Sequence, residues 1–75
     1  MILPELLKTL RTRMLMSQET FAKEMHVTVC TINRWENGKS KPNITAINTI
    51  KAFCNKNNIA FEEIENAWHE VNKNG

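Results

Sequence analysis

The chain has 75 residues, which allows one domain, and its 41% of hydrophobic residues is ordinary for a small globular protein. No apolar run is long enough to cross a membrane, and the first residues lack the pattern of a secretory signal, so we expect a cytoplasmic protein. The net charge is only +2, but residues 1–60 carry +5 and the last fifteen residues carry −3. This asymmetry indicates phosphate contacts on a basic side, or simply an unevenly charged solvated surface.

The first predicted element is a helix over residues 4–15. Pro4 is tolerated at a first helical position, and the apolar side chains that follow recur at helical spacing. They form one stripe: Leu3, Leu6, Leu7, Leu10 and Met14. The stripe predicts a core-facing side, and Arg11 falls on the polar side of the same helix.

Residues 17–38 divide into a helix, a turn and a second helix. Ser17 can cap the first helix, which has an apolar face, and Thr28 can cap the second over residues 29–37. The turn falls at His26-Val27, and Gly38 is expected to end the second helix in the left-handed conformation. The apolar face of the first helix consists of Phe21, Ala22 and Met25.

The second of these helices has two different sides at about 100° per residue. Thr31, Ile32 and Trp35 share the arc that we expect to face the core. The opposite arc is suited to base edges in a major groove, because Arg pairs with guanine, Asn with adenine and a small apolar group with the thymine methyl. An ordinary solvated helix face is the alternative. The outward arc consists of Val29, Cys30, Asn33 and Arg34.

Two further helices are predicted. Asn43 can cap a helix that is apolar nearly all round, which suits the most buried helix of the domain; its apolar residues are Ile44, Ile47, Ile50, Ala52, Phe53 and Cys54. In the last helix we expect Phe61 and Ile64 to complete the core. Trp68 and Val71 either form a two-fold dimer contact, or Trp68 folds back on the first helix. We expect the domain to span residues 1–71 and residues 72–75 to be a frayed tail.

Taken together, these residues resemble the helix-turn-helix of the phage-repressor and Cro-like proteins, the XRE family. The resemblance covers about residues 3–68 without a gap. The matching residues are Ser17-Gln18-Glu19, Phe21-Ala22, Met25, Val27-Thr28, Thr31-Ile32, Arg34-Trp35-Glu36, Asn37-Gly38, Lys39 and Lys41-Pro42. It implies an all-α, compact five-helix, lambda-repressor-like DNA-binding domain with the helix-turn-helix at helices 2 and 3.

The resemblance also implies roles for single residues. It implies a structural ion pair between Arg11 and Glu36, and a phosphate contact for Gln18, for which simple helix capping is the alternative. His26 stands where the family usually has glycine, and a left-handed conformation there costs a non-glycine residue ~1–2 kcal/mol. Asn58 likewise stands at a glycine position, and asparagine tolerates that conformation.

The DNA contacts are expected on the second helix of the motif and the loop after it. We rank Arg34 first for direct base reading and expect it to contact a guanine. Val29 and Cys30 are expected to contact methyl groups of bases, and Asn33 either reads adenine or faces water. The phosphate contacts are expected from Gln18, Thr28, Asn37, Lys39, Ser40 and Lys41.

The sequence holds no catalytic constellation, and with glycine only at 38 and 75 it has no phosphate-binding loop. We therefore expect no enzyme and no cofactor. Cys30 and Cys54 are isolated, and a metal site built from His26, Cys30 and His69 is not expected.

The leading hypothesis is sequence-specific binding of double-stranded DNA by a small transcriptional repressor, associated with the nucleoid. It would act as a homodimer on a two-fold symmetric operator, with the recognition helix in the major groove. The alternative is a module that binds a protein partner, such as the antitoxin of a toxin–antitoxin pair.

Overall fold

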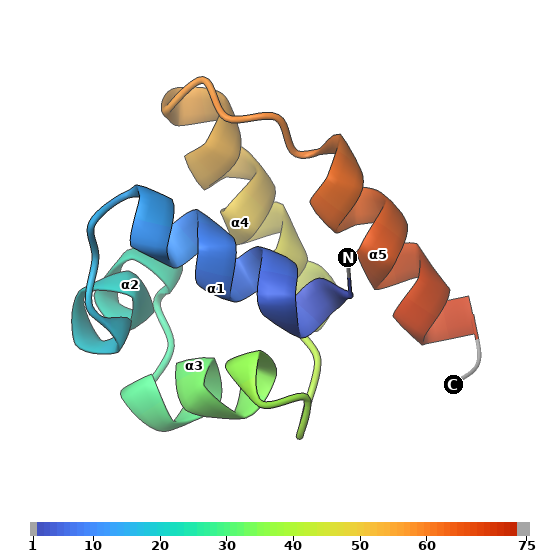
Figure 1. Ribbon diagram of the computed structural model, residues 1–75, viewed down its shortest axis with the longest axis horizontal. Helices are drawn as coiled ribbons and strands as arrows, with labels where there is room; N and C mark the ends of the chain where they lie inside the picture. Colours follow the sequence, from blue (N-terminus) through green and yellow to red (C-terminus); the bar gives the residue numbers. More distant parts are fainter. Residues whose placement is uncertain (1, 74–75) are drawn as a thin grey trace.

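The computed structural model describes residues 2–73, and over that range the chain forms five α-helices and no strand. In Figure 1, α1 crosses the middle of the molecule, with α2 and α3 on one side and α4 and α5 on the other. The helices are α1 (Leu3–Arg13), α2 (Gln18–Met25), α3 (Val29–Glu36), α4 (Ile44–Lys56) and α5 (Glu62–Lys73). The predicted all-α, five-helix fold is confirmed.

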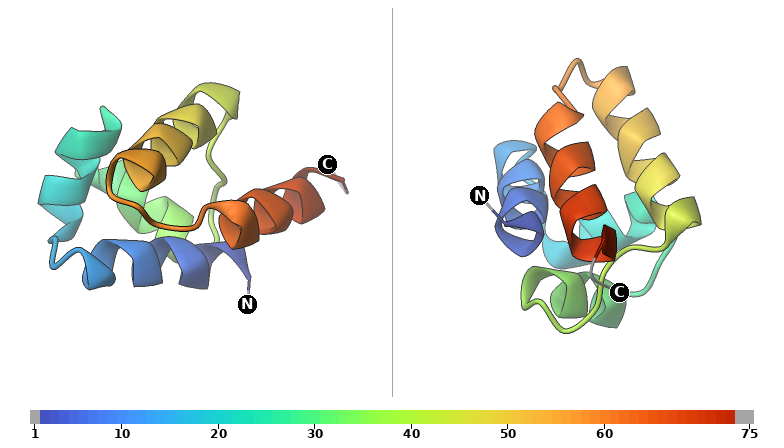
Figure 2. Two further views of the ribbon diagram at one scale, coloured as in Figure 1. Left: turned by 90° about the horizontal axis from the view of Figure 1, so that it is seen from above. Right: turned by 90° about the vertical axis from the view of Figure 1, so that its right-hand side faces the viewer.

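The helices surround one core. Helix α1 packs against α3 and α5, while α2 packs against α3 and α4, and Figure 2 shows this arrangement from two further sides. The radius of gyration is 11.1 Å, which matches the value of about 11 Å expected for one domain of this length. None of the described helices is long and apolar enough to cross a membrane.

Three of the helices begin at polar caps that the sequence predicts. The hydroxyl of Ser17 accepts a hydrogen bond from the Thr20 amide at 3.1 Å, before α2. The hydroxyl of Thr28 accepts from the Thr31 amide at 3.2 Å, before α3. The Asn43 side chain accepts from the Ala46 amide at 2.8 Å, before α4. Each cap satisfies an amide that has no partner inside its helix, and together they fix where α2, α3 and α4 start.

The first four helices all end in the same way. Each is followed by a residue in the left-handed conformation, and the next amide bonds back to the carbonyl five residues earlier, the pattern of a Schellman motif. The left-handed residues are Leu15, His26, Gly38 and Asn58. Three of the next residues, Met16, Val27 and Ile59, pack against the core, whereas Lys39 is exposed. The turn after α3 is therefore the one that directs a charged side chain outward.

The end of α1 corrects the predicted boundary. The sequence predicts a helix to residue 15, but α1 ends at Arg13. Leu15 has φ 57° and is 93% exposed, so it cannot continue a right-handed helix. His26, with φ 61° and ψ 38°, adopts the expected left-handed conformation in the place of the family's glycine.

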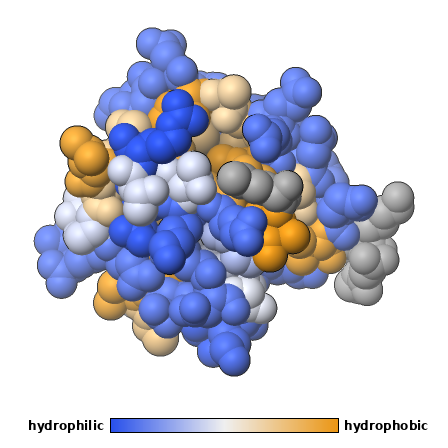
Figure 3. All heavy atoms as spheres, viewed as in Figure 1, coloured by the Kyte–Doolittle hydropathy of each residue, from blue (hydrophilic) through white to orange (hydrophobic). Residues whose placement is uncertain are grey.

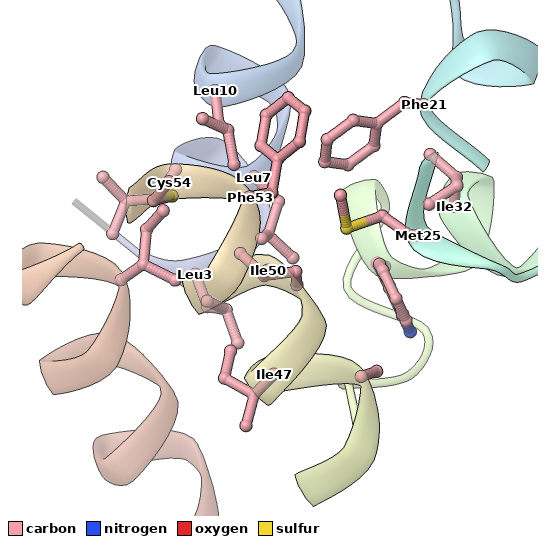
Figure 4. Packing of buried hydrophobic residues seen from close by; sticks show 14 of the residues in the cluster. Leu3, Leu7, Leu10, Phe21, Met25, Ile32, Ile47, Ile50, Phe53 and Cys54 are labelled. Atoms are coloured by element: carbon pink, nitrogen blue, oxygen red, sulfur yellow. The ribbon is translucent and has the colours of Figure 1, made fainter. Parts of the chain in front are cut away.

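The core receives apolar side chains from all five helices, and Figure 4 shows those of α1 to α4 pointing toward one another. The rings of Phe21 and Phe53 meet edge to face, with centroids 6.0 Å apart. Cys54 is fully buried, as expected. One expectation is wrong: Ile44 and Ala52 are exposed, so α4 buries one side rather than its whole circumference.

Helix α5 closes the domain from the other side of α1. Ile64 is buried and Phe61 is half-buried, so both contribute to the core. The indole nitrogen of Trp68 donates to the carbonyl of Pro42 at 2.7 Å, so Trp68 turns back into its own domain and bonds to the α3–α4 loop. Helix α5 continues to Lys73, past the predicted domain end at residue 71; residues 74 and 75 of the predicted tail lie outside the described residues.

Candidate nucleic-acid interface

Helix α3 has one side in the core and one in solvent. Ile32 is 0% and Trp35 4% exposed, and these two side chains hold the helix against the domain. The opposite arc is exposed as predicted and consists of Val29, Cys30, Asn33 and Arg34. Figure 3 shows that the surface along the lower edge of the molecule, over α3 and the following loop, is mostly hydrophilic with small apolar areas. The side chains with suitable chemistry for base edges therefore lie together on an accessible surface.

The carboxylate of Glu36, at the end of α3, fixes the orientation of this helix. Arg11 Nε lies 2.7 Å from Glu36 Oε2, and Arg11 Nη2 donates to Oε1 at 3.0 Å, so the ion pair expected from the resemblance is formed with bidentate geometry. The Arg11 side chain is 12% exposed and that of Glu36 5% exposed. The pair thus joins α1 to α3 in a largely water-excluded position.

Two further hydrogen bonds extend this pair. Arg11 Nη1 donates to the carbonyl of Met16 at 2.9 Å, and Gln18 Nε2 donates to Glu36 Oε1 at 3.1 Å. The hydrogen bond with Glu36, aided by its charge, raises the pKa of Arg11 even though burial opposes the shift. Arg11 is therefore a permanent cation that ties together α1, the start of α2 and the end of α3.

Gln18 and Asn37 have partners inside the protein that the sequence did not predict. One amide hydrogen of Gln18 is used by Glu36, which leaves the other for a phosphate. Asn37 Nδ2 donates to the carbonyl of Asn33 at 2.9 Å and to Asn33 Oδ1 at 3.2 Å. The side-chain nitrogen of Asn37 is thus engaged with its own helix, and its predicted phosphate contact stays a prediction. The i, i+4 spacing of the two asparagines was the available signal.

The loop after α3 is fixed at both ends and exposed between them. Gly38 has φ 71°, where an L side chain is strained, and the amide of Lys39 bonds to the carbonyl of Arg34 at 2.8 Å. At the other end Pro42 is buried and accepts the hydrogen bond from Trp68. Lys39 and Lys41 are exposed, and Ser40 between them is half-buried. Thr28, which caps the start of α3 through its hydroxyl, is also exposed.

The cysteines differ in environment. Cys30 is exposed on the outer arc of α3, whereas Cys54 is buried in the core, where desolvation raises its pKa. Within residues 2–73 no group of three or more His, Cys, Asp or Glu side chains lies close enough together to hold a metal ion. The polar chemistry that the described surface offers around α3 is thus hydrogen-bond donors, amides and cations.

Comparison with known proteins is consistent with this geometry. A family model described as helix-turn-helix matches residues 7–59, which include most of α1 and all of α2, α3 and α4. No curated protein and no solved structure gives a significant match. The matched region holds the cap of α2, the left-handed turn at His26, the outward arc of α3 and the basic loop. With more than half of its length matched, the chain belongs to the XRE-type helix-turn-helix family of Cro-like and repressor-like DNA-binding proteins.

Proposed function

We propose that this helix-turn-helix protein is a small transcriptional repressor that inserts α3 into the major groove of a specific duplex operator. The observation that carries the proposal is the exposed arc of α3, held outward by the burial of Ile32 and Trp35 on its other side. The exposed groups of this arc match the hydrogen-bonding groups and methyls of base edges, a match that a helix facing only solvent would not require. The arc ends beside a loop with two exposed lysines, Lys39 and Lys41.

The exposed arc divides into two kinds of base contact. Arg34 has a fork of donors that fits guanine O6 and N7, a pairing that discriminates by ~1–3 kcal/mol against other bases. Val29, 46% exposed, and Cys30 near the start of α3 offer small apolar groups to the methyl of thymine. We therefore expect Arg34 to contribute most of the hydrogen-bonded specificity.

Phosphate contacts flank this arc on both sides. Lys39 and Lys41 are exposed after α3, while the hydroxyl of Thr28 and the second amide hydrogen of Gln18 lie before it and beside it. Ser40, between the lysines, supplies a further hydroxyl. Each lysine that neutralises a phosphate contributes about 0.9 to the slope of log affinity against log salt.

A homodimer would match a two-fold symmetric operator whose half-sites lie about 34–36 Å apart. Exposed apolar side chains support a contact of this kind: Ile2 is 62% and Val71 39% exposed, and both line one groove beside the α3–α4 loop. Because Trp68 is bonded within its own domain, we assign the larger share of the contact to Val71. Val71→Ser is expected to lower affinity for the full operator while leaving half-site affinity unchanged. Equal affinity of wild type and variant for the full operator would contradict this assignment.

The test of the function is selection from random duplex DNA, followed by anisotropy titrations of the selected site at several salt concentrations. We expect a two-fold symmetric motif, and we expect Arg34→Ala to abolish the preference for it. Lys39→Ala should reduce the salt slope by about one unit, whereas the matched control Lys51→Ala, in the groove between α4 and α5, should leave it unchanged. Failure to enrich any motif would contradict the proposal.

A protein partner is the second candidate, and one observation favours it. The outward side of α5 carries the exposed carboxylates Glu62, Glu63 and Glu70, which DNA would repel and a basic protein surface would attract. An antitoxin-like role would combine this helix with DNA binding through α3. Stoichiometric co-purification of a second polypeptide, lost on replacing these three glutamates by glutamine, would support that role; purification of the chain alone would count against it.

A further inference from the structure

The last turn of α3 and the residue that caps it carry two side-chain amides, Asn33 and Asn37, whose orientation follows from their contacts. Asn37 Nδ2 lies 2.9 Å from the main-chain oxygen of Asn33 and 3.2 Å from Asn33 Oδ1. A carbonyl oxygen only accepts, so the Asn37 atom that faces it must be the amide nitrogen. The Asn33 atom that faces the same nitrogen must then be its oxygen. Both side chains are exposed, on the arc that carries the proposed base contacts.

We propose that Asn37 is a positioning residue for specificity, which turns the amide of Asn33 so that its donor side is favoured toward DNA. The proposal rests on the function proposed above, since it concerns how α3 reads a base. With Oδ1 directed along the helix toward Asn37, the nitrogen of the planar Asn33 amide is the group left for the groove. The side-chain nitrogen of Asn37 faces the two oxygens of Asn33, so it is engaged along the helix rather than directed at a base.

This orientation changes which bases Asn33 favours. An asparagine that reads adenine does so with both ends of its amide, accepting from N6 and donating to N7. A donor alone fits the acceptors of guanine, thymine or adenine N7 and rejects cytosine, whose major-groove edge offers only the N4 donor. At the base that Asn33 meets, we therefore expect cytosine to be disfavoured and adenine to have a smaller advantage over guanine than a freely turning asparagine would give it.

Two substitutions at position 37 test the mechanism with opposite expectations. Asn37→Ala releases the Asn33 amide, which can then form the two-ended pair without first breaking the exposed i, i+4 hydrogen bond, so adenine should gain roughly 1.5- to 2-fold over guanine at that base. Asn37→Asp replaces the donor by a carboxylate that only accepts, so Asn33 must turn its nitrogen inward and its oxygen to the groove. Cytosine and adenine should then improve relative to guanine and thymine at the same base.

The measurement is the relative affinity for all four bases at every position of the selected operator, for wild type and variants. Asn33→Ala locates the base concerned, and adding Asn37→Ala to Asn33→Ala should change no further preference. Lys39→Ala is the matched control, expected to weaken all sequences equally. Circular dichroism melting checks that each variant is folded. Because Gly38 ends the helix in every variant, we expect all of them to retain α3.

The outcomes separate this inference from the proposed function. A motif whose preferences are changed by Asn37→Ala and Asn37→Asp at the Asn33 base, in the two directions given, supports the positioning role. A motif whose preferences do not change, or a uniform loss of affinity as for Lys39→Ala, overturns it and makes Asn37 a phosphate contact or a bystander. Absence of any motif for the wild type overturns the proposed function itself.

Discussion

Removal of the Arg11 side chain is expected to destabilise the domain severely. Arg11→Ala takes two of the three side-chain donors from the carboxylate of Glu36, whose side chain is 5% exposed, and also the donor from the Met16 carbonyl. Breaking a fully buried ion pair by deleting one partner costs about 3–5 kcal/mol, because the other charge is left without compensation. This pair is part-buried, so we expect the lower end of that range. Since small domains have total stabilities at the low end of about 5–15 kcal/mol, this loss is a large fraction of the whole.

Thermal unfolding followed by circular dichroism measures this cost. For a domain of this size 1 kcal/mol shifts the melting temperature by about 4–8 °C, so a loss of 3 kcal/mol lowers it by about 12–24 °C. Arg13→Ala is the matched control, since Arg13 is an exposed arginine in the same last turn of α1 and its loss should cost less than about 0.5 kcal/mol. Replacing Arg11 and Glu36 together by methionine should restore much of the stability, because no buried charge is then left unpaired.

The melting temperature of Arg11→Ala relative to Arg13→Ala decides whether the pair behaves as a buried one. If Arg11→Ala melts within a few degrees of Arg13→Ala, the pair behaves like an exposed salt bridge, with a contribution of about 0–1 kcal/mol, and the reasoning from burial is wrong. DNA affinity adds a second criterion. We expect it to fall together with stability, because Glu36 lies at the end of α3, the proposed recognition helix. Loss of binding at an unchanged melting temperature would instead make Arg11 a phosphate contact.

Three further predictions concern other parts of the chain. Leu15→Gly and His26→Gly should each raise the melting temperature by a few degrees. The relief of ~1–2 kcal/mol of left-handed strain exceeds the entropic cost of the more flexible unfolded chain that glycine produces. A lower melting temperature would contradict this prediction. Alkylation of the native protein should modify exposed Cys30 and spare buried Cys54, as read by peptide mass, and should abolish operator binding; full affinity after modification would remove Cys30 from the interface. Burial raises the pKa of the Cys54 thiol, so the stability that this thiol contributes is complete below the unfolded-state pKa of about 8.5 and is lost as the pH rises through the folded-state pKa. The free energy of unfolding, measured from pH 7 to 10, should therefore fall more steeply with pH in wild type than in Cys54→Ala. Equal pH dependence in the two proteins would refute this prediction.

The starts of the helices could be predicted from the sequence because their chemistry is local. Ser17, Thr28 and Asn43 each bond to an amide three residues later, so the signal and its consequence lie within one turn. The end of α1 could not be predicted in this way, since leucine carries no left-handed preference. What favours φ 57° at Leu15 is the packing of Met16 on the core and its bond to Arg11, both of which depend on the assembled fold.

The candidate site shows the same division. Helical spacing alone identified the exposed arc of α3, because burial of Ile32 and Trp35 determines which way the opposite residues face. Spacing did not show what each amide bonds to in the folded protein. Asn37 was expected at a phosphate but its side chain bonds to Asn33, and the indole of Trp68 bonds to the carbonyl of Pro42, 26 residues away in sequence. The partner of Trp68 depends on where a distant segment lies in the fold, and the partner of Asn37 depends on which of several nearby acceptors its amide prefers.

If α3 reads DNA as proposed, the end of this helix and the residues after it separate stability from specificity. Glu36 points into the protein and binds Arg11, Asn37 bonds back along the helix to Asn33, and Gly38 reverses the chain so that Lys39 lies outside. Adjacent residues therefore act on different properties, since loss of the Glu36 contacts costs folding energy whereas a change at residue 37 redirects an exposed amide. A new operator preference can thus arise by substitution along the exposed arc without disturbing the core contacts that hold the helix in place.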